Sequence, residues 1–248
     1  MDYDIFSKYY DLLTGDVDYA NRAQYITELF IKYDKMPSLL LDVGCGTGGF
    51  SLEFARRGVE VIGVDPSSGM LNLAKQKAVE QGLDILFLNQ SGEGLDLYGT
   101  VDGAVCCLDT VNHIVDKRVL QRFFNKISLF LETESLFIFD VNTLYKHKYI
   151  LADNTFVFEN DDVYCIWRNA FYSKGKITDI CLDFFENKNG AYIRSTEEFS
   201  ERVYSIEELT KMLGKAGMDI VDVFGENSFL PPKKNEERNI IIARKGKN

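Results

Sequence analysis

The sequence predicts an α/β fold in which a doubly wound, mostly parallel sheet carries a small inserted antiparallel sheet. Three observations support this prediction. Short apolar segments alternate with helical segments five times between residues 39 and 141, which is typical of a parallel sheet covered by helices on both faces. Residues 155–204 change to period-two alternation, as antiparallel strands do. Two further apolar segments follow near the end of the chain.

In chain order, the first regular segment is expected to be helical and separate from the sheet. Residues 1–37 are expected to be mostly helical, and a helix from Tyr19 to Tyr33 repeats apolar side chains at helical spacing before Pro37. The alternating frame then begins. Its expected strands are 39–43, 59–64, 84–89, 101–107 and 136–141, and its expected helices are 49–57, 67–81 and 117–131.

The second part of the chain is expected to interrupt the alternation of strands and helices with an insertion and then to resume it. Asn189-Gly190 separates two alternating runs and is a strong hairpin signal. Ser205-x-x-Glu208 has the form of a capping box, which predicts a helix from there to Lys215. Final strands at 219–224 and 239–243 are expected to pair antiparallel. We therefore expect one domain from residues 1–149 and 205–248, and an inserted antiparallel β unit from residues 150–204.

Composition narrows the class of protein. The chain has 248 residues and a formal net charge of −10, which disfavours nucleic-acid binding because that affinity depends heavily on Lys and Arg. No apolar run approaches the roughly 20 residues of a membrane span, and the first residues lack the features of a secretory signal. Five cysteines without C-x-x-C spacing predict neither a zinc site nor a disulfide framework. We expect a soluble, cytoplasmic protein without a metal.

A glycine-rich loop carries the strongest functional signal. The segment 42–49, Asp-Val-Gly-Cys-Gly-Thr-Gly-Gly, lies between an expected strand and an expected helix. Glycines allow a tight turn and a close approach of ligand to backbone, and the helix N-terminus beyond them offers unpaired N–H groups. Asp65 ends the next strand, where its carboxylate is suited to accept hydrogen bonds from the two hydroxyls of a ribose. This arrangement predicts a nucleotide-bearing cofactor.

Two cofactors compete for the loop. Gly44, Gly46 and Gly49 satisfy G-x-G-x-x-G, and Asp65 lies 21 residues beyond Gly44, as in enzymes that bind a nicotinamide dinucleotide. Three details favour S-adenosylmethionine instead. Asp42 precedes the first glycine, Gly48 completes G-x-G-x-G, and residues 64–71 read Val-Asp-Pro-Ser-Ser-Gly-Met-Leu. These features resemble the cofactor loops of class I S-adenosylmethionine-dependent methyltransferases.

The resemblance extends over most of the chain and is to small bacterial class I enzymes of the "methyltransferase domain" type. Phe6-x-x-x-Tyr10-Asp11 resembles their N-terminal Tyr-Asp element, residues 107–113 their segment after the fourth strand, and residues 139–143 the end of their fifth strand. The resemblance implies a seven-stranded sheet with a reversed final strand. It also implies a substrate lid made of the N-terminal helices 1–37 and the inserted sheet.

For the cofactor, the resemblance and the two motifs together indicate a set of contact residues. These are Tyr10, Tyr19, Asp42, Gly44, Cys45, Gly46, Thr47, Gly48, Asp65, Pro66, Met70, Gln90, Ser91, Gly92, Cys107 and Leu108. One departure concerns the acidic residue that usually accepts a hydrogen bond from the adenine amine after the third strand. That position falls on Ser91, so Ser91 or a backbone carbonyl is the candidate adenine contact.

The sequence indicates less about the methyl acceptor than about the cofactor. In-line transfer from a sulfonium depends on positioning the acceptor more than on a catalytic base, so no fixed catalytic motif is required. His113 is a candidate general base, or else a histidine that packs against the lid. Asp109, Asn112 and Trp167 are candidate substrate contacts, and Phe171, Phe184 and Phe185 are candidates for an aromatic wall or for packing of the insert. His147 is expected to be solvated on a helix.

The predicted function is methyl transfer to a small molecule. The alternatives are an NAD-dependent oxidoreductase, a methyltransferase acting on tRNA or protein, and a non-catalytic partner protein that binds S-adenosylmethionine.

Overall fold

The structure is a computed structural model that describes residues 4–247. Its larger sheet is built from β1 (Leu39–Val43), β2 (Glu60–Asp65), β3 (Leu86–Asn89), β4 (Val101–Cys106), β5 (Leu131–Asn142), β10 (Met218–Gly225) and β11 (Arg238–Lys245). The strand order across this sheet is β10-β11-β5-β4-β1-β2-β3. Strands β1 to β5 pair in parallel, whereas β11 is antiparallel to both β5 and β10. The expected seven-stranded sheet with a reversed final strand is confirmed.

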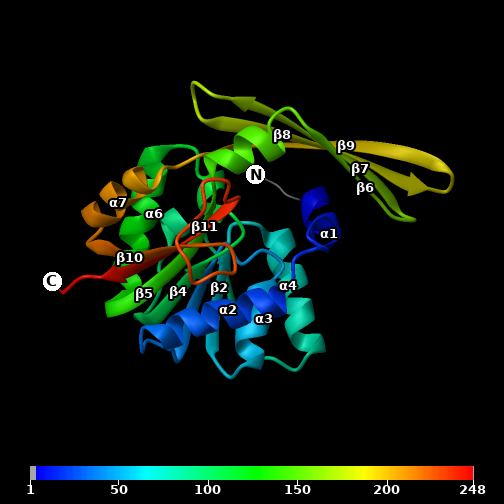
Figure 1. Cartoon of the computed structure of the whole chain (residues 1–248). Coiled ribbons are helices and arrows are strands. Elements are labelled where there is room, and N and C mark those ends of the chain that lie inside the picture. The colour runs from blue at the N-terminus through cyan, green and yellow to red at the C-terminus, as the bar shows by residue number, and fades with distance from the viewer. Residues whose placement is uncertain (1–3, 248) are drawn as a thin grey trace.

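Helices cover both faces of this sheet (Figure 1). One face carries α2 (Tyr19–Lys32), α3 (Gly49–Arg56) and α4 (Ser68–Glu80), and the other carries α6 (Lys117–Phe130) and α7 (Ile206–Lys215). Side chains cap four of these helices at their first turn: Asp18 caps α2, Ser67 caps α4, Asp116 caps α6 and Ser205 caps α7. The predicted capping box is present, since Ser205 Oγ accepts from the Glu208 N–H and Glu208 Oε2 accepts from the Ser205 N–H.

A second sheet of four antiparallel strands lies beside the first, above α1 in Figure 1. Its strands, in their spatial order, are β6 (Thr155–Glu159), β7 (Val163–Tyr172), β8 (Ile177–Lys188) and β9 (Ala191–Arg202). The hairpin at Asn189-Gly190 is confirmed, and both residues have positive φ, 55° and 86°, as a type I′ turn requires. One face packs its apolar side chains against α1 (Asp4–Leu13). Residues 1–3 of the expected N-terminal helical segment lie outside the described residues.

Three features differ from the sequence-based expectation. Strand β5 begins at Leu131 rather than at 136, because Leu131 is fully buried and pairs with Val101 before the register shifts. A short helix α5 (Thr110–His113) follows β4, and a π-helix η2 (Lys146–Leu151) follows β5. Both short helices lie at the carboxyl ends of parallel strands, which is where open α/β sheets bind ligands. Within residues 4–247, no helix combines the length and apolar character needed to cross a membrane.

Candidate active site

The glycine loop is tied to the end of the neighbouring strand β2. The Asp65 carboxylate accepts the N–H of Gly46 at 3.0 Å and that of Ser67 at 2.8 Å, so it fixes the start of the loop and the start of α4 together. Gly44 has a φ of 73°, and a Cβ there would lie 2.5 Å from Cγ2 of Thr110. The backbone conformation and the close approach of Thr110 both require glycine at this position. Burial raises the pKa of Asp65.

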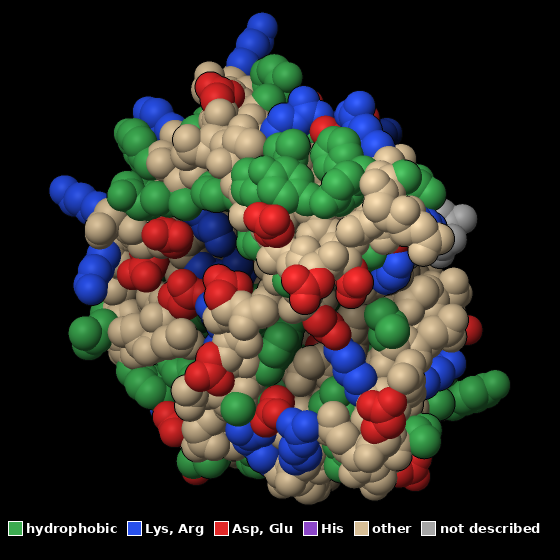
Figure 2. All heavy atoms as spheres, turned by 90° about the vertical axis from the view of Figure 1, so that its right-hand side faces the viewer, with side chains coloured by type: hydrophobic (Ala, Val, Ile, Leu, Met, Phe, Trp, Pro, Cys, Tyr) green, Lys and Arg blue, Asp and Glu red, His purple; other side chains and the backbone are tan. Residues whose placement is uncertain are grey.

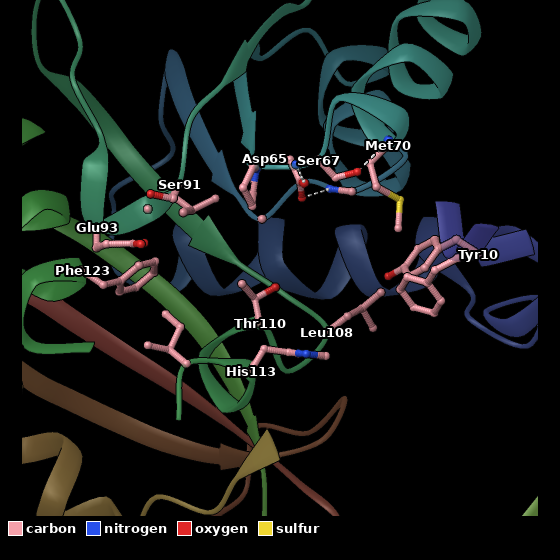
Figure 3. Close-up of a pocket in the computed structure, with 17 residues that line it drawn as sticks. Tyr10, Asp65, Ser67, Met70, Ser91, Glu93, Leu108, Thr110, His113 and Phe123 are labelled. Carbon is pink, nitrogen blue, oxygen red and sulfur yellow. Dashed lines mark hydrogen bonds between the residues drawn. The ribbon is translucent and has the colours of Figure 1, made fainter. Parts of the chain in front are cut away.

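A cavity of about 200 Å³ opens beside this loop (Figure 3). Ser91, Glu93 and Phe123 lie at one end of it, Met70 and Tyr10 at the other, and Asp65 between them. Nine of the predicted cofactor contacts line this cavity: Tyr10, Gly44, Gly46, Asp65, Pro66, Met70, Ser91, Gly92 and Leu108. The sequence therefore predicted most of one continuous surface from segments that are far apart in the chain.

The other predicted cofactor contacts support this surface from behind or beside it. Buried Asp42 accepts from Ser51 Oγ at 2.6 Å, and its burial raises its pKa to about 6. Thr47 donates to Asp11, and the side-chain amide of Gln90 bonds to the backbone of Asp96. Tyr19, Cys45, Gly48 and Cys107 also lie outside the lining of the cavity.

Seven lining residues were not among the predicted contacts. They are Phe6, Val43, Ser67, Glu93, Thr110, Ile114 and Phe123. Glu93 is the informative one, because it brings a carboxylate to the end of the cavity where Ser91 replaces the expected acidic residue. It lies in a short 3₁₀ helix, Gly92–Gly94, that begins just after Ser91. The signal was visible as the first carboxylate after β3, two residues beyond the expected position.

A second cavity, of about 430 Å³, adjoins the first. The two share four lining residues, namely Phe6, Tyr10, Leu108 and His113. The predicted substrate contacts Asp109 and Trp167 line the second cavity, together with Phe156, Phe158 and Phe199. Figure 2 shows a hollow beneath the four-stranded sheet, with Asp and Glu side chains around it and Lys or Arg side chains inside it. The second cavity is therefore bounded by α1, by the inserted sheet and by the carboxyl ends of the parallel strands.

Asn112, the third predicted substrate contact, does not line either of these cavities. Its side chain is fully buried and joins three backbone segments. Its amide nitrogen donates to the carbonyls of Asn142 and Arg202, and its oxygen accepts the N–H of Asn142. Asn112 thereby links α5 to the ends of β5 and β9.

The proposed aromatic wall is divided between different surroundings. Trp167 lines the second cavity, and its indole N–H donates to Asn169 at 2.7 Å. Phe184 is fully buried in the core between the inserted sheet and α1. The ring of Phe171 lies 6.4 Å from that of His147, and the ring of Phe185 contacts that of Tyr164. Of these four side chains, Trp167 is the one that lines a described cavity.

His113 lies where the two cavities meet. Its side chain is 33% exposed, and its ring lies 5.1 Å from that of Phe199. Burial lowers the pKa of His113, although the charges of Asp109 and Asp65 oppose this effect. A neutral imidazole at a junction of two cavities is available to accept a proton.

His147 is not solvated, and that expectation was wrong. The π-helix η2 turns its ring inward, where it is fully buried and its Nδ1 lies 2.7 Å from Oγ1 of Thr178. Burial lowers the pKa of His147 to about 4. The segment around His147, Tyr-Lys-His-Lys at residues 145–148, is polar on average. Its sequence therefore does not show which side chain turns toward the protein interior.

Comparison with known proteins shows which proteins this chain is similar to. A family profile described as "Methyltransferase domain" matches residues 40–134. A Bacillus subtilis (strain 168) protein named "Putative methyltransferase YqeM" is 30% identical over 249 residues, which cover 100% of this chain and 98% of that protein. The crystal structure of an S-adenosylmethionine-dependent methyltransferase from Clostridium acetobutylicum ATCC 824 has a TM-score of 0.88 at 30% identity and covers 99% of each chain.

A more distant likeness is one of fold alone. The S-adenosylmethionine-bound structure of CalS10, an amino pentose methyltransferase from Micromonospora echinaspora, has a TM-score of 0.75 at 16% identity and covers 99% of this chain and 98% of that chain.

Proposed function

Because the chain belongs to the family of S-adenosylmethionine-dependent methyltransferases, we propose that its first cavity holds the cofactor and its second cavity holds a small-molecule methyl acceptor. One observation carries this proposal. The two cavities meet at Phe6, Tyr10, Leu108 and His113, so a donor in one and an acceptor in the other would have their reacting atoms at a shared boundary. In-line methyl transfer needs such an arrangement, since its rate depends on proximity and orientation.

The residues of the first cavity fit the cofactor. Asp65 supplies a carboxylate for the ribose hydroxyls, at the centre of the cavity in Figure 3. Phe123 and Gly92 make a flat apolar surface at one end, where a Cβ on Gly92 would lie 2.4 Å from the Phe123 ring. Ser91 and Glu93 are beside it, so we assign the adenine to this end and the amine contact to Glu93. Once bound, S-adenosylmethionine supplies an electrophilic methyl group on sulfur.

The chain's own residues then orient the acceptor and exclude water. We propose that α1 and the inserted unit, residues 150–204, act as the substrate lid, because side chains from both line the second cavity. The aromatic side chains that line the second cavity exclude water from the acceptor. His113 is our candidate for accepting a proton from the acceptor, since it lines both cavities.

A small acceptor is favoured over tRNA or a protein. The second cavity is bounded on several sides, and the chain carries a net charge of −10, which disfavours a polyanionic acceptor. The name of CalS10 does not decide the acceptor of this chain, because the two share only a fold. A cytoplasmic location is also part of this proposal; its support is that all five cysteines, which lie within the described residues, are free thiols.

Calorimetric titration with S-adenosylmethionine, S-adenosylhomocysteine and NAD tests the cofactor assignment. We expect micromolar binding of the two sulfur nucleotides and no binding of NAD. Binding of NAD alone would overturn the proposal and revive the oxidoreductase alternative. Methyl transfer to any acceptor from a small-molecule panel would exclude the non-catalytic alternative.

A further inference from the structure

One carboxylate in the second cavity is buried but has an oxygen without a hydrogen bond. Glu201, near the end of β9, is 3% exposed. Its Oε2 accepts from the side-chain amide of Asn142 at 3.2 Å. Its Oε1 receives no hydrogen bond from any described residue, and the ring Nε2 of His113 lies 3.9 Å from it. This oxygen is not fully buried, and Glu201 lines the second cavity, so Oε1 is open to a polar group that arrives with a ligand.

The surroundings of Glu201 set its pKa and therefore whether its side chain is protonated. Burial and the nearby charge of Asp109 raise its pKa to about 8, whereas Asn142, Lys146 and Arg238 act in the opposite direction. His147 Nε2 lies 3.6 Å from Oε2 and has no hydrogen-bond partner. A carboxyl group that titrates near neutral pH is suited to exchange a proton with a basic ligand.

The walls of the cavity indicate the charge of that ligand. Five carboxylates line it, from Asp16, Asp109, Glu201, Glu226 and Glu237, against three cations, from Arg22, Lys146 and Arg238. Arg22 and Arg238 already form ion pairs with lining carboxylates. Six aromatic side chains complete the wall: Phe6, Tyr10, Phe156, Phe158, Trp167 and Phe199. Carboxylates combined with aromatic faces favour a cationic ligand, since ring faces attract ammonium groups.

We propose that the methyl acceptor is an amine that enters the second cavity as an ammonium ion, and that Glu201 binds this ammonium and takes its proton. For such an acceptor Glu201, and not His113, is the proton acceptor. The inference rests on the proposed function, because it concerns the acceptor of the same reaction. Neither the motifs nor the resemblance assigned any role to Glu201. It is supplied by the inserted sheet, so it also gives that sheet a chemical role in addition to covering the site.

The proposed step balances in protons and electrons. An ammonium nitrogen has no lone pair, so one N–H bond breaks first and its proton passes to the Glu201 carboxylate. The freed lone pair forms a nitrogen–carbon bond to the methyl group while the sulfur–carbon bond breaks, and the electron pair of that bond stays on sulfur. The product is a methylated ammonium, a neutral thioether and a protonated Glu201, which returns its proton to solvent.

A divalent cation is the competing ligand for this cluster, since Asp109, His113 and Glu201 each have a ligand atom within 4.8 Å of the others. Asp109 is already committed, however. Its Oδ1 accepts from Arg238 at 3.0 Å and its Oδ2 accepts from Asn142 at 2.8 Å. The pair left for a ligand is therefore His113 and Glu201, which offers a single carboxylate, whereas cations such as Mg²⁺ and Ca²⁺ prefer several oxygen ligands.

Sinefungin tests the proposal even while the acceptor is unidentified. In this analogue of the cofactor an amine-bearing carbon replaces the methylated sulfur, so its ammonium takes the place of the methyl group and faces the acceptor side. Titration calorimetry at pH 7 compares sinefungin with S-adenosylhomocysteine in the wild type, in Glu201→Gln and in the control Glu198→Gln. Glu198 lies on the same strand β9, but it is exposed and lines neither the first nor the second cavity.

We expect the wild type to bind sinefungin about tenfold more tightly than S-adenosylhomocysteine, as a charge-assisted contact allows. Glu201→Gln should abolish this preference, and Glu198→Gln should keep it. An unchanged preference for sinefungin in Glu201→Gln would overturn the amine proposal. The proposed function would still stand in that case, provided that the wild type binds S-adenosylhomocysteine. Failure of the wild type to bind S-adenosylhomocysteine would reject the proposed function itself.

A measurement on the wild type covers the case in which Glu201→Gln does not fold. Because unliganded Glu201 is mostly protonated at pH 7, an arriving ammonium should expel its proton. Calorimetry in buffers of different ionisation enthalpy should show release of roughly half to one proton per sinefungin bound, and none for S-adenosylhomocysteine. Equal proton release for both ligands would reject the proposal. A titration with Mg²⁺ in the same series should give no heat, and saturable Mg²⁺ binding lost in Glu201→Gln would replace the amine with a metal.

Discussion

Arg238 donates to Oδ1 of Asp140 at 2.5 Å across the pairing of β11 with β5. The same carboxylate accepts the backbone N–H of Leu108 at 2.8 Å and that of Asp109 at 2.6 Å. Leu108 and Asp109 have φ values of 54° and 55°, a conformation that non-glycine residues seldom adopt. The ion pair between Arg238 and Asp140 thus holds the strained loop that carries His113 to the junction of the two cavities.

We expect Arg238→Met to lower the free energy of unfolding by about 3–5 kcal/mol, because it leaves the buried carboxylate of Asp140 and the half-buried carboxylate of Asp109 without their cation. Urea denaturation followed by circular dichroism measures the change. Arg118→Met is the control, since Arg118 forms an exposed ion pair with Asp116 and its removal should leave the unfolding free energy nearly unchanged. A loss in Arg238→Met as small as that of the control would mean that the pair does not hold the loop.

Asp65→Ala should weaken binding of S-adenosylhomocysteine by roughly 3 kcal/mol, about a hundredfold, through loss of the ribose contacts. Titration calorimetry measures the affinity, and the Tm of the variant shows how far the loss of the Gly46 and Ser67 hydrogen bonds loosens the fold. Asp84→Ala is the control. Asp84 is exposed, precedes β3 and lies outside the lining of the first cavity. Unchanged affinity in Asp65→Ala would reject the assignment of this carboxylate.

Glu93→Gln should remove discrimination at the adenine amine. The wild type is expected to bind S-adenosylhomocysteine about tenfold more tightly than S-inosylhomocysteine, in which an oxo group replaces the amine, because the amine donates to a carboxylate and the oxo group cannot. The variant should bind the two ligands with similar affinity. Ser91→Ala serves as the matched variant from the same end of the cavity. If Ser91→Ala removes the preference and Glu93→Gln keeps it, the adenine contact belongs to Ser91.

The pKa of His147 predicts a dependence of stability on pH. The folded state holds this pKa at about 4 against an ordinary 6.5, so protonation favours the unfolded chain. The stability that depends on neutral His147 is therefore complete above pH 6.5 and is lost as pH falls toward 4. Between pH 7 and 4.5 the wild type should lose about 2–3 kcal/mol more than His147→Gln. Urea denaturation at both pH values measures this difference, and equal losses would contradict the burial of the ring.

The sequence predicted the lining of the first cavity better than that of the second, for a physical reason. The glycine loop and Asp65 follow β1 and β2, and the ends of adjacent parallel strands meet at one edge of a sheet. Their proximity therefore follows from the order of the elements. Glu201 reaches His113 only because the β8–β9 hairpin register places it opposite Thr178 and the whole insert docks on α1 and α5. That docking depends on packing between distant segments, and no local pattern encodes it.

Gly44 allows the sharpest test of the glycine loop, because the chain offers a matched position. Gly44 and Gly82 both have positive φ, 73° and 65°, but a Cβ on Gly44 would meet Thr110 whereas a Cβ on Gly82 would meet nothing within 4 Å. Gly82→Ala should therefore cost about 1 kcal/mol of unfolding free energy from backbone strain alone. Gly44→Ala should cost about 1–3 kcal/mol more, as overpacking does, and should weaken cofactor binding at least about tenfold.

The double variant Gly44→Ala with Thr110→Ala separates the two contributions. Removing Cγ2 and Oγ1 of Thr110 takes away the closest contacts of the new methyl group and leaves Cβ at 3.2 Å. The double variant should therefore regain part of the stability lost in Gly44→Ala. The loss of unfolding free energy that remains should equal the backbone strain that Gly82→Ala measures. Chemical denaturation and calorimetry with S-adenosylhomocysteine check the two quantities. If Thr110→Ala restores neither, the close packing of α5 against the glycine loop is not what requires glycine at position 44.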